Sequence, residues 1–541
     1  MKFNNARECW KEILSDPASK AGLLSEIAKF ARENLEPANI VFGTSGWRGE
    51  IGSDYTFNNL RIVTTAIIEM FKEQDASVME ALGVRDIDEI KRRGVVVGHD
   101  NRFLGPEFAM SVIGLLNKEG IKAYYSGETI TPEFSSSLEE LGAACSINLT
   151  PSHNPSVWAG YKFNPADGGP AGPEITRVIE KYANGLMAQH AIIPYAPASQ
   201  YETIDPVGLY LRFVEKKKTL DIAGIRKFIA DNDVLICIDH VHGASRGRPQ
   251  RIIGDSPKVR YFRTNDDYLF GGIAPEPSSR NMKAVTETLR ASSARYKLGV
   301  IIDPDGDRIR FTDGETELPM NYFGALAFHF FHKYKKLDGI VTKSVATSNF
   351  ANAIAEKLGL PIRETMVGFK NFRQYMLPGA KERAIIAFEE SDGISGYNHT
   401  LEKDAIFGLL VAIEMMSMTG MNIGKYLYSV QEEFGFFYPD RAGVEVAREL
   451  VGKPLTEKLA RIKNTLKVGS TVSFDNVTKM VKTMITLDGT KIVFDDDSWL
   501  LIRPSGTEPK VRFYIETRSE KEKDIMFKKA EEITRAAIAA S

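Results

Sequence analysis

Apolar and polar positions alternate along this chain in a pattern typical of α/β proteins. Short apolar runs at 95–97, 234–238 and 298–302 have the length of buried strands. Longer stretches of helical character, among them 107–117 and 349–358, lie between such runs. The alternation predicts α/β layers with mainly parallel sheets.

The length of the chain indicates that these elements are distributed over several domains. A chain of 541 residues with 43% apolar content is too long for one core and is expected to form three or four domains. The N-terminal segment, up to about residue 40, is expected to be a helical extension with a helix starting at 15–17. The predicted ranges are 1–200 for the extension and a first α/β domain, 201–315 and 316–437 for two further α/β domains, and 438–541 for a smaller α+β domain whose final helix starts near Glu520.

A serine is presented by the loop 150–155, which follows the strand-like run 143–149. A proline on each side of the serine limits backbone freedom and removes amide donors. Ser152 is therefore expected on a stiff turn, with His153 beside it and Lys162 ten residues further on. Taken alone, such a segment is more often a polar turn with a capping serine, so the accompanying motifs decide its role.

Three carboxylates, Asp303, Asp305 and Asp307, follow an apolar run at alternate positions. Like charges so close together raise each other's pKa, and a hard divalent cation removes that cost. Carboxylate oxygens suit Mg²⁺, which also takes phosphate oxygens. An EF-hand would need glycine at the sixth position and glutamate at the twelfth, where this chain has Arg308 and Gly314. Arg308 indicates an anionic ligand beside the ion, and an acidic turn without metal is the remaining alternative.

A third polar cluster, 388–393, follows the apolar run 384–387 and contains Glu389 and Ser391, with Lys403 farther along. Adjacent carboxylates and hydroxyls can bind the vicinal hydroxyls of a sugar. A solvated acidic loop has the same composition, so this motif depends on the others.

The fourth cluster lies between two strand-like runs near the C-terminus and combines arginine, hydroxyl and glycine residues. Guanidinium forks, hydroxyls and a glycine that lets backbone amides approach make a phosphate cradle, and a plain hairpin loop is the alternative. Its members are Arg503, Ser505, Gly506, Thr507 and Arg512.

Together these four segments resemble the α-D-phosphohexomutase family, which comprises phosphoglucomutases, phosphomannomutases and relatives. The resemblance covers nearly the whole chain and includes the segments 43–49, 98–102 and 160–162. The chain departs from the family at Pro151, where alanine is usual, and at Asp392 in the sugar loop, which leaves the choice of sugar open.

The resemblance implies a fold of three related mixed-sheet α/β domains plus a smaller C-terminal α+β domain around a central cleft. It implies reversible transfer of phosphate between the 1- and 6-positions of a hexose through phosphorylated Ser152, with hexose 1,6-bisphosphate as intermediate and activator. Mg²⁺ is expected on Asp303, Asp305, Asp307 and the serine phosphate. The expected catalytic residues are Ser152, His153, Lys162, Arg308 and Arg48, and the expected substrate-binding residues are Glu389, Ser391, Lys403, Arg503, Ser505, Gly506, Thr507 and Arg512.

Two other classes of protein share part of these motifs. A metal-dependent sugar phosphatase would use the aspartates and the cradle, but it would need no second, sugar-specific loop. A sugar-phosphate sensor would not need a serine, three aspartates and Arg503 together. Glucose is the expected sugar because 389–391 resembles phosphoglucomutases more closely. Mannose, or both sugars, is the alternative, and glucosamine and pentose phosphates rank below them.

Net charge and cysteine content limit the kinds of binding partner and the cellular compartment that are expected for this chain. A net charge of −2, from 69 Lys and Arg against 71 Asp and Glu, gives no reason to expect nucleic acid or an anionic membrane as a partner. The expected partner is a small sugar phosphate, bound by a monomer or a homodimer. Three cysteines cannot form a disulfide framework, which favours the cytoplasm. No apolar run reaches membrane-spanning length, and the N-terminus does not have the pattern of a secretory signal.

Overall fold

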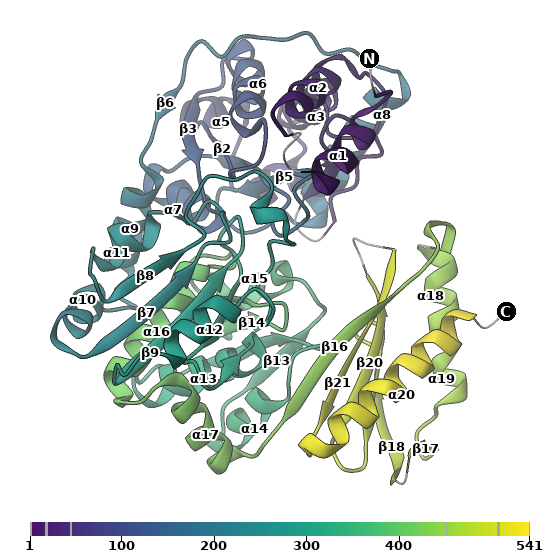
Figure 1. Ribbon diagram of the computed structural model, residues 1–541. Helices are drawn as coiled ribbons and strands as arrows, with labels where there is room; N and C mark the ends of the chain where they lie inside the picture. Colours follow the sequence, from purple (N-terminus) through teal and green to yellow (C-terminus); the bar gives the residue numbers. More distant parts are fainter. Residues whose placement is uncertain are drawn as a thin grey trace. The chain divides into compact units, whose positions relative to one another are not determined.

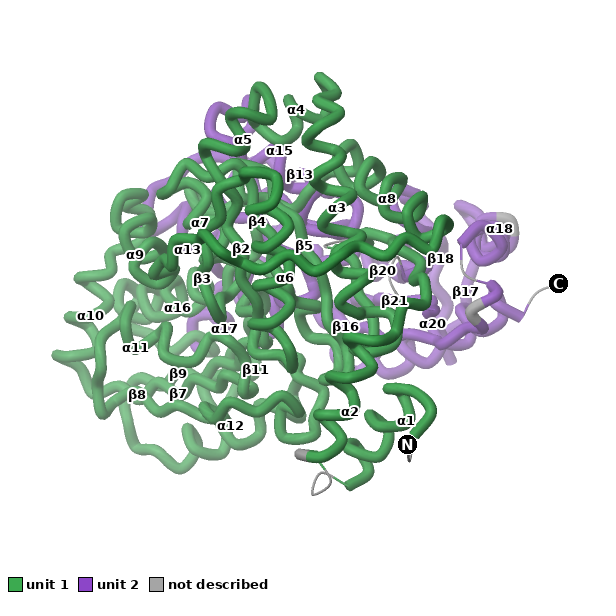
Figure 2. The backbone as a smooth tube through the Cα atoms, turned by 90° about the horizontal axis from the view of Figure 1, so that it is seen from above, with its two compact units in different colours: residues 1–317, 393–424 green, residues 318–392, 425–541 purple. Residues whose placement is uncertain are grey.

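The computed structural model describes residues 3–16, 20–43, 46–450, 452–475, 477–505 and 509–539. The chain forms two compact units (Figure 2), unit 1 from residues 1–317 and 393–424 and unit 2 from residues 318–392 and 425–541. The borders of the two units do not coincide with the four predicted domain ranges, which stay a prediction.

Two helices precede the first sheet and form the predicted N-terminal extension. α1 (Ala6–Ser15) starts after Asn5, whose side chain caps its first turn, and α2 (Lys20–Glu33) follows. The predicted helix start at 15–17 coincides with the end of α1, whose last turn is closed by the N–H of Asp16. Pro17 lies outside the described residues.

The first sheet of unit 1 has six strands in the order β1-β5-β4-β2-β3-β6. Its strands β2, β3, β5 and β6 are labelled in Figure 1. Its inner strands β2, β3 and β4 are parallel, while β5 is antiparallel to β4 and β1 is antiparallel to β5. β2 is buried over its whole length, as expected for a parallel strand covered on both faces, and α6 and α7 pack against it. The elements of this part are β1 (Trp47–Glu50), α3 (Phe57–Glu73), α4 (Ala76–Leu82), α5 (Ile87–Arg93), β2 (Val95–His99), α6 (Gly105–Lys118), β3 (Ala123–Glu128), α7 (Thr131–Leu141), β4 (Cys145–Leu149), β5 (Trp158–Pro165), α8 (Pro173–Ala188) and β6 (Glu202–Thr203).

The strands of the second sheet that lie wholly within unit 1 follow the order β10-β9-β7-β8, and the short β11 pairs with β10 as the fifth strand of this sheet. β7 is parallel to β8 and β9, and β10 is antiparallel to β9. The elements here are α9 (Pro206–Lys217), α10 (Ile222–Asp231), β7 (Val234–Asp239), α11 (Arg248–Ile253), β8 (Val259–Phe262), η2 (Phe270–Gly272), α12 (Lys283–Arg290), β9 (Tyr296–Ile302), β10 (Ile309–Thr312), the short β11 (Glu317–Leu318) at the border of the units, and later in the chain β15 (Gly393–Gly396) and α16 (Ala405–Thr419).

These two sheets share one topology, which bears out the predicted relation between the α/β parts. In each, the first of the parallel strands (β2 or β7) is central, the second (β3 or β8) lies on one side of it and the third (β4 or β9) on the other. A fourth, antiparallel strand (β5 or β10) follows the third. The loop between the third and fourth strands carries Ser152 in the first sheet and Asp303 to Asp307 in the second. We call the loop between β4 and β5, which carries Ser152, the serine loop, and the loop between β9 and β10, which carries Asp303 to Asp307, the metal loop. The two loops therefore occupy equivalent positions of a repeated motif.

Unit 2 begins with a parallel arrangement in which β12 pairs with β13 on one side and β14 on the other. The loop that carries Glu389 and Ser391 follows β14, the third strand of this set, as in unit 1. The elements are α13 (Met320–Lys333), β12 (Ile340–Ser344), α14 (Phe350–Leu358), β13 (Ile362–Thr365), η3 (Phe369–Phe372), α15 (Arg373–Met376), β14 (Ala384–Glu389) and, across the border of the units, α17 (Ile423–Phe434).

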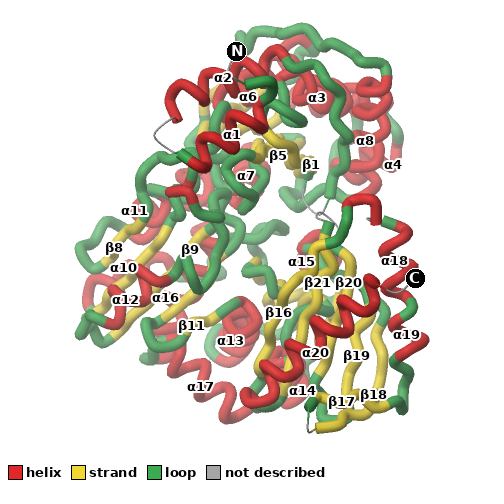
Figure 3. The backbone as a smooth tube through the Cα atoms, turned by 45° about the vertical axis from the view of Figure 1, so that its right-hand side comes forward, coloured by secondary structure: helices red, strands yellow, loops and turns green. Residues whose placement is uncertain are grey.

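The rest of unit 2 is an antiparallel sheet in the order β16-β21-β20-β19-β18-β17 (Figure 3). The last helix, α20, begins at Glu520 as predicted and packs against β16 and β21, so this part has the predicted α+β form. The elements are β16 (Tyr438–Glu445), η4 (Arg448–Leu450), α18 (Lys453–Ala460), α19 (Ile462–Thr465), β17 (Thr471–Phe474), β18 (Val477–Ile485), β19 (Thr490–Phe494), β20 (Trp499–Pro504), β21 (Lys510–Thr517) and α20 (Glu520–Ala539).

Within the described part of the chain, no single helix is long and apolar enough to cross a membrane. Only α16 and α17 taken together, as a bent pair, reach the length and composition required.

Candidate active site

The serine loop holds Ser152 in a left-handed backbone conformation, with φ of 61°. This region is unfavourable for residues other than glycine and persists only where the surroundings impose it. The Ser152 N–H donates to Thr150 Oγ1 (3.0 Å), and the side chain is buried. The loop is therefore stiff, as predicted from its prolines, but its shape depends on contacts from elsewhere in the sheet.

Arg102, at the end of the neighbouring strand β2, supplies most of those contacts. Its guanidinium donates to the carbonyls of Ser152 (2.7 Å), Asn154 (2.6 Å), Pro155 (2.7 Å) and Trp158 (3.1 Å). The side chain is 3% exposed, so these bonds are shielded from water. One buried cation thus holds the main chain at Ser152 and in the segment that follows it.

Asp100 orients this arginine. Its carboxylate pairs with Arg102 Nε (3.2 Å) and accepts hydrogen bonds from Arg102 N–H (3.0 Å) and Thr150 Oγ1 (2.7 Å). Sequence reasoning included 98–102 in the family resemblance but assigned no role to these side chains. The available signal was an Asp-x-Arg pair in the loop directly after a buried strand.

The Ser152 hydroxyl points to the metal loop. Its Oγ donates to Asp303 Oδ2 (2.9 Å) and lies 3.4 Å from His153 Nδ1. Arg48, predicted to be catalytic, donates from Nε to the carbonyl of Pro151 (3.1 Å) and so contacts the same loop. The structure therefore brings the predicted serine, histidine and arginine together with one of the predicted metal ligands.

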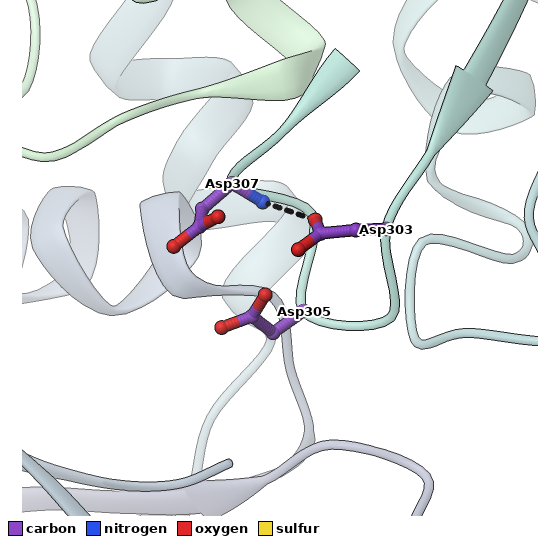
Figure 4. Close-up of side chains that lie close together, drawn as sticks. All are labelled: Asp303, Asp305 and Asp307. Atoms are coloured by element: carbon purple, nitrogen blue, oxygen red, sulfur yellow. Dashed lines mark hydrogen bonds between the residues drawn. The ribbon is translucent and has the colours of Figure 1, made fainter. Parts of the chain in front are cut away.

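Asp303, Asp305 and Asp307 form a compact, buried cluster (Figure 4). One oxygen of each carboxylate lies within 4.8 Å of the others, and Asp303 Oδ1 accepts from the backbone N–H of Asp307 and of Arg308, both at 3.0 Å. Among the described residues, the buried Oδ1 atoms of Asp305 and Asp307 have no hydrogen-bond partner. Buried carboxylate oxygens without a donor are costly, and a cation would satisfy them.

The electrostatics of the cluster are uneven. Burial, together with the charges of Asp305 and Asp307, raises the pKa of the Asp303 carboxyl well above its ordinary value. Burial opposes ionisation of Asp307 as well, but Lys403, Lys162 and Arg308 outweigh it and hold the pKa of Asp307 below its ordinary range. Basic side chains therefore stabilise the ionised form of Asp307, whereas burial and its acidic neighbours disfavour the ionised form of Asp303.

Two of these basic side chains are buried lysines. Lys162 Nζ lies 2.6 Å from Asp305 Oδ2 and 3.2 Å from Asp307 Oδ2, and Lys403 Nζ lies 3.2 Å from Asp307 Oδ2. Burial lowers the pKa of Lys162, but its acidic neighbours outweigh that effect and raise it. Lys403 was predicted to bind substrate together with Glu389, and the structure places its ammonium at the metal loop.

Thr131, the first residue of α7, was not singled out from the sequence. Its Oγ1 donates to Asp305 Oδ2 (2.9 Å), and its N–H donates to the carbonyl of Asp305 (2.7 Å). The preceding residue, Ile130, explains a glycine in the metal loop. Gly306 has φ of 67°, and a Cβ there would lie 2.8 Å from Ile130 Cβ.

The predicted sugar and phosphate loops belong to unit 2. Glu389 is buried at the end of β14, and Ser391 follows it half-buried. Arg503 and Arg512 face each other across β20 and β21, and the Ser505 N–H closes their hairpin on the carbonyl of Lys510 (2.8 Å). Gly506 and Thr507 lie outside the described residues.

Four models of the phosphoglucomutase/phosphomannomutase family match the chain in order. They are alpha/beta/alpha domain I at residues 39–190, domain II at 210–316, domain III at 319–434 and the C-terminal domain at 445–532. Phosphoglucomutase 1 of Drosophila melanogaster is 27% identical over 477 residues, 78% of this chain and 83% of the relative. A phosphoglucosamine/phosphogalactosamine mutase of Sulfurisphaera tokodaii is 24% identical over 494 residues, 89% of this chain and 96% of the relative.

The fold is also that of a solved phosphoglucomutase. The structure of parafusin from Paramecium, in an open form, is similar with a TM-score of 0.73 at 20% identity, over 93% of this chain and 96% of that one.

The chain therefore belongs to the phosphoglucomutase/phosphomannomutase family, which confirms the resemblance to α-D-phosphohexomutases. It is an enzyme, a phosphohexose mutase that transfers phosphate within its substrate.

Proposed function

We propose that this mutase interconverts hexose 1-phosphate and hexose 6-phosphate, with glucose as its sugar, through a phosphate carried on Ser152. The observation that carries the proposal is the 2.9 Å hydrogen bond from Ser152 Oγ to Asp303, which joins the serine to three buried carboxylates. Phosphoryl transfer depends on positioning and on charge stabilisation, and a clamped serine beside a candidate metal site supplies both.

In the proposed first step, the bond from phosphorus to Ser152 Oγ breaks as a bond to the free hydroxyl oxygen of the substrate forms. The proton of that hydroxyl needs an acceptor, and His153 Nδ1, 3.4 Å from Ser152 Oγ, is close enough to the reacting oxygens to take it. The resulting hexose 1,6-bisphosphate turns over and returns its other phosphate to Ser152. His153 then gives its proton back to the sugar oxygen that leaves.

Lys162, like His153, is an expected catalytic residue and a candidate for proton transfer, but its contacts favour a narrower role. Its ammonium is bonded to Asp305 and Asp307, and these carboxylates keep it protonated. A protonated amine cannot accept a proton. We therefore assign to Lys162 the stabilisation of charge on the transferring phosphate, with Arg48 and Arg308 assisting.

The carboxylate cluster fits Mg²⁺. Its donors are all carboxylate oxygens, two of them without a hydrogen-bond partner among the described residues. The proposed ligands are Asp303, Asp305, Asp307 and an oxygen of phosphorylated Ser152. When bound, the ion supplies positive charge next to the phosphate.

Substrate binding is assigned to the loops of unit 2 and to Lys403. Carboxylate and hydroxyl groups bind the sugar hydroxyls, and the guanidinium forks bind the phosphate that is not reacting. The proposed residues are Glu389 and Ser391 for the sugar, Arg503, Ser505, Gly506, Thr507 and Arg512 for the phosphate, and Lys403 near the reacting group.

Glucose is proposed because the segment 389–391 resembles phosphoglucomutases and because Phosphoglucomutase 1 of Drosophila melanogaster is among the relatives. The relative from Sulfurisphaera tokodaii acts on amino sugars by name, so the test must include them. One coupled assay of kcat/KM on the 1-phosphates of glucose, mannose, glucosamine and ribose decides. A higher kcat/KM for any sugar other than glucose overturns the choice.

The phosphoserine itself is tested by Ser152→Ala. We expect turnover to fall by at least roughly a thousandfold, because a positioned covalent carrier is lost. Peptide mass spectrometry of the parent protein, treated with glucose 1,6-bisphosphate, should find phosphate on Ser152. Phosphate found consistently on another residue, or an alanine variant with near-normal turnover, would contradict the assignment.

A further inference from the structure

Unit 2 joins its two sheets through the hairpin of β18 and β19. Lys491, on β19, is buried and donates from Nζ to the carbonyl of Val345 (2.9 Å), just after β12. Asp488, in the turn of the hairpin, accepts at Oδ2 a hydrogen bond from the N–H of Val367 (3.0 Å), just after β13. An apolar cluster lies around the first contact and is formed by Val345, Ala346, Trp499, Leu501 and Tyr514. The hairpin is thus docked on the carboxyl ends of two parallel strands.

Asp488 makes a second contact, with an arginine of the proposed phosphate loop. The same oxygen, Oδ2, lies 3.1 Å from Arg503 Nε, and the two side chains are 19% and 11% exposed. Such burial reduces the screening of the pair by salt and water. Among the described residues, the Arg503 Nε–H has no acceptor in hydrogen-bonding geometry, so Asp488 acts on the guanidinium as an ion-pair partner.

The turn that carries Asp488 also lies directly against the backbone of Arg503. Gly489 has φ of 83°, and a Cβ at this position would come within 2.6 Å of Arg503 Cβ. Burial lowers the pKa of Arg503, but Tyr514 and Asp488 outweigh it and raise the pKa, which keeps the guanidinium charged. The Cα and Cβ atoms of Arg503 are therefore packed against the turn, and its guanidinium is held by the carboxylate of Asp488.

We propose that Asp488 is a positioning residue for the mutase reaction, which holds the guanidinium of Arg503 and ties it to the backbone that follows β13. The inference rests on the proposed function, in which Arg503 grips the phosphate that is not reacting. Arginine has many rotamers, and fixing it before the ligand arrives removes part of the ordering cost of binding. Of the two hairpin contacts with the parallel strands, only that of Asp488 also reaches Arg503.

A simpler role for Asp488 would be to offset the charge of Arg503. A carboxylate close to an anionic ligand weakens its binding, so removing this carboxylate would then lower KM. Positioning predicts the opposite sign, because an Arg503 that has lost its partner must be ordered by the substrate. The direction of the change in KM separates the two roles.

The experiment measures KM and kcat for glucose 1-phosphate in Asp488→Ala and Asp488→Asn. We expect KM to rise roughly tenfold in Asp488→Ala, with kcat changed by less than about threefold, as for loss of one contact to a charged group. Asp488→Asn keeps an acceptor for the Val367 N–H without the charge, so its KM should lie between those of the alanine variant and the parent. An unchanged or lower KM in Asp488→Ala overturns the inference. If the alanine variant does not fold, Asp488→Ser takes its place with the same expected rise.

Two controls keep this result apart from the proposed function and from general damage. Asp497→Asn changes a carboxylate in the next hairpin turn, where it pairs with the exposed Lys482, and should leave KM unchanged. Arg503→Ala tests the phosphate loop itself. If it does not change KM, the proposed function of the loop fails. If it raises KM and Asp488→Ala does not, only the positioning role fails.

A double variant and a spectroscopic readout complete the test. Adding Asp488→Ala to Arg503→Ala should raise KM no further, because both changes remove one interaction, and an additive rise would contradict the inference. In the parent protein labelled with ¹⁵N-arginine, the Nε–H signal of Arg503, assigned by its loss in Arg503→Lys, should be single and shifted from that of free arginine. In Asp488→Ala it should broaden or move to the free position, and an unchanged signal would count against positioning.

Discussion

The serine loop and the metal loop of unit 1 occupy equivalent positions in two sheets of the same topology, yet buried charges hold them differently. Arg102 binds the main chain of the serine segment, where four carbonyls between 152 and 158 accept its hydrogen bonds. In the metal loop, Lys162 and Lys403 bind the side-chain carboxylates, and the backbone carbonyls are bound by N–H groups of neighbouring segments, among them that of Thr131. A loop whose side chain must react is best fixed by its backbone. A loop whose side chains must bind a cation needs its charges balanced in the meantime.

Because the two loops are held differently, substitutions in them are expected to affect different quantities: the free energy of unfolding for Arg102 and turnover for the carboxylates. Removing Arg102 would leave Asp100 as a buried charge without its partner and would leave several carbonyls without donors, which is costly to the fold. Removing one carboxylate of the metal loop reduces repulsion between like charges and leaves Lys162 bonded to another carboxylate. We expect variants of the two loops to show opposite balances of lost stability and lost turnover.

The largest effect on turnover among these variants is expected for Asp305→Asn, which removes one charge of the metal loop at constant size. Turnover in Mg²⁺ should fall roughly 100- to 1000-fold, the range seen when a group that stabilises transition-state charge is lost. The parent should lose activity in EDTA and regain it with Mg²⁺. Asp266→Asn, the same change at a half-exposed position of unit 1, is the matched control and should keep parental turnover. Full activity of Asp305→Asn would exclude Asp305 as a metal ligand.

The next largest effect is expected for Arg102→Met and falls on stability. Unfolding by denaturant should show a loss of about 3–5 kcal/mol, the cost of breaking a buried pair and leaving its partner uncompensated. Arg251→Met removes an arginine whose ion pair with Asp205 is half-exposed, and should cost less than about 1 kcal/mol. Equal losses in the two variants would mean that Arg102 is not what holds the serine loop.

The smallest effect is expected for Thr131→Val, which keeps the shape of the side chain but removes its hydroxyl. Asp305 then loses one hydrogen bond and Lys162 loses one acceptor, so turnover should fall about tenfold, in line with a hydrogen bond to a charged group. Thr131→Ser keeps the hydroxyl and is the matched variant that should retain most of the activity. If serine and valine variants are equally impaired, Thr131 acts through packing and not through its hydroxyl.

Local sequence was sufficient to predict the strands, the loops that follow them and the residue types those loops present. The runs at 95–97 and 298–302 are parts of β2 and β9, and the final helix begins at Glu520 as expected. Apolar length, prolines and carboxylate spacing are properties of neighbours in the chain, so they can be read without knowing the fold. Local reasoning missed the helix α1, whose first turn is capped by the side chain of Asn5 and which ends at the segment 15–16.

Contacts between distant segments were decided only by the tertiary structure. Nothing near Arg102 in sequence shows that it binds carbonyls some fifty residues away, or that Lys403 meets Asp307, or that Asp488 pairs with Arg503. These contacts exist because the ends of parallel strands converge at one edge of a sheet and because a hairpin docks on another sheet. The sequence gives the chemical type of each side chain. Which charged groups contact that side chain depends on which strands become neighbours in the folded protein.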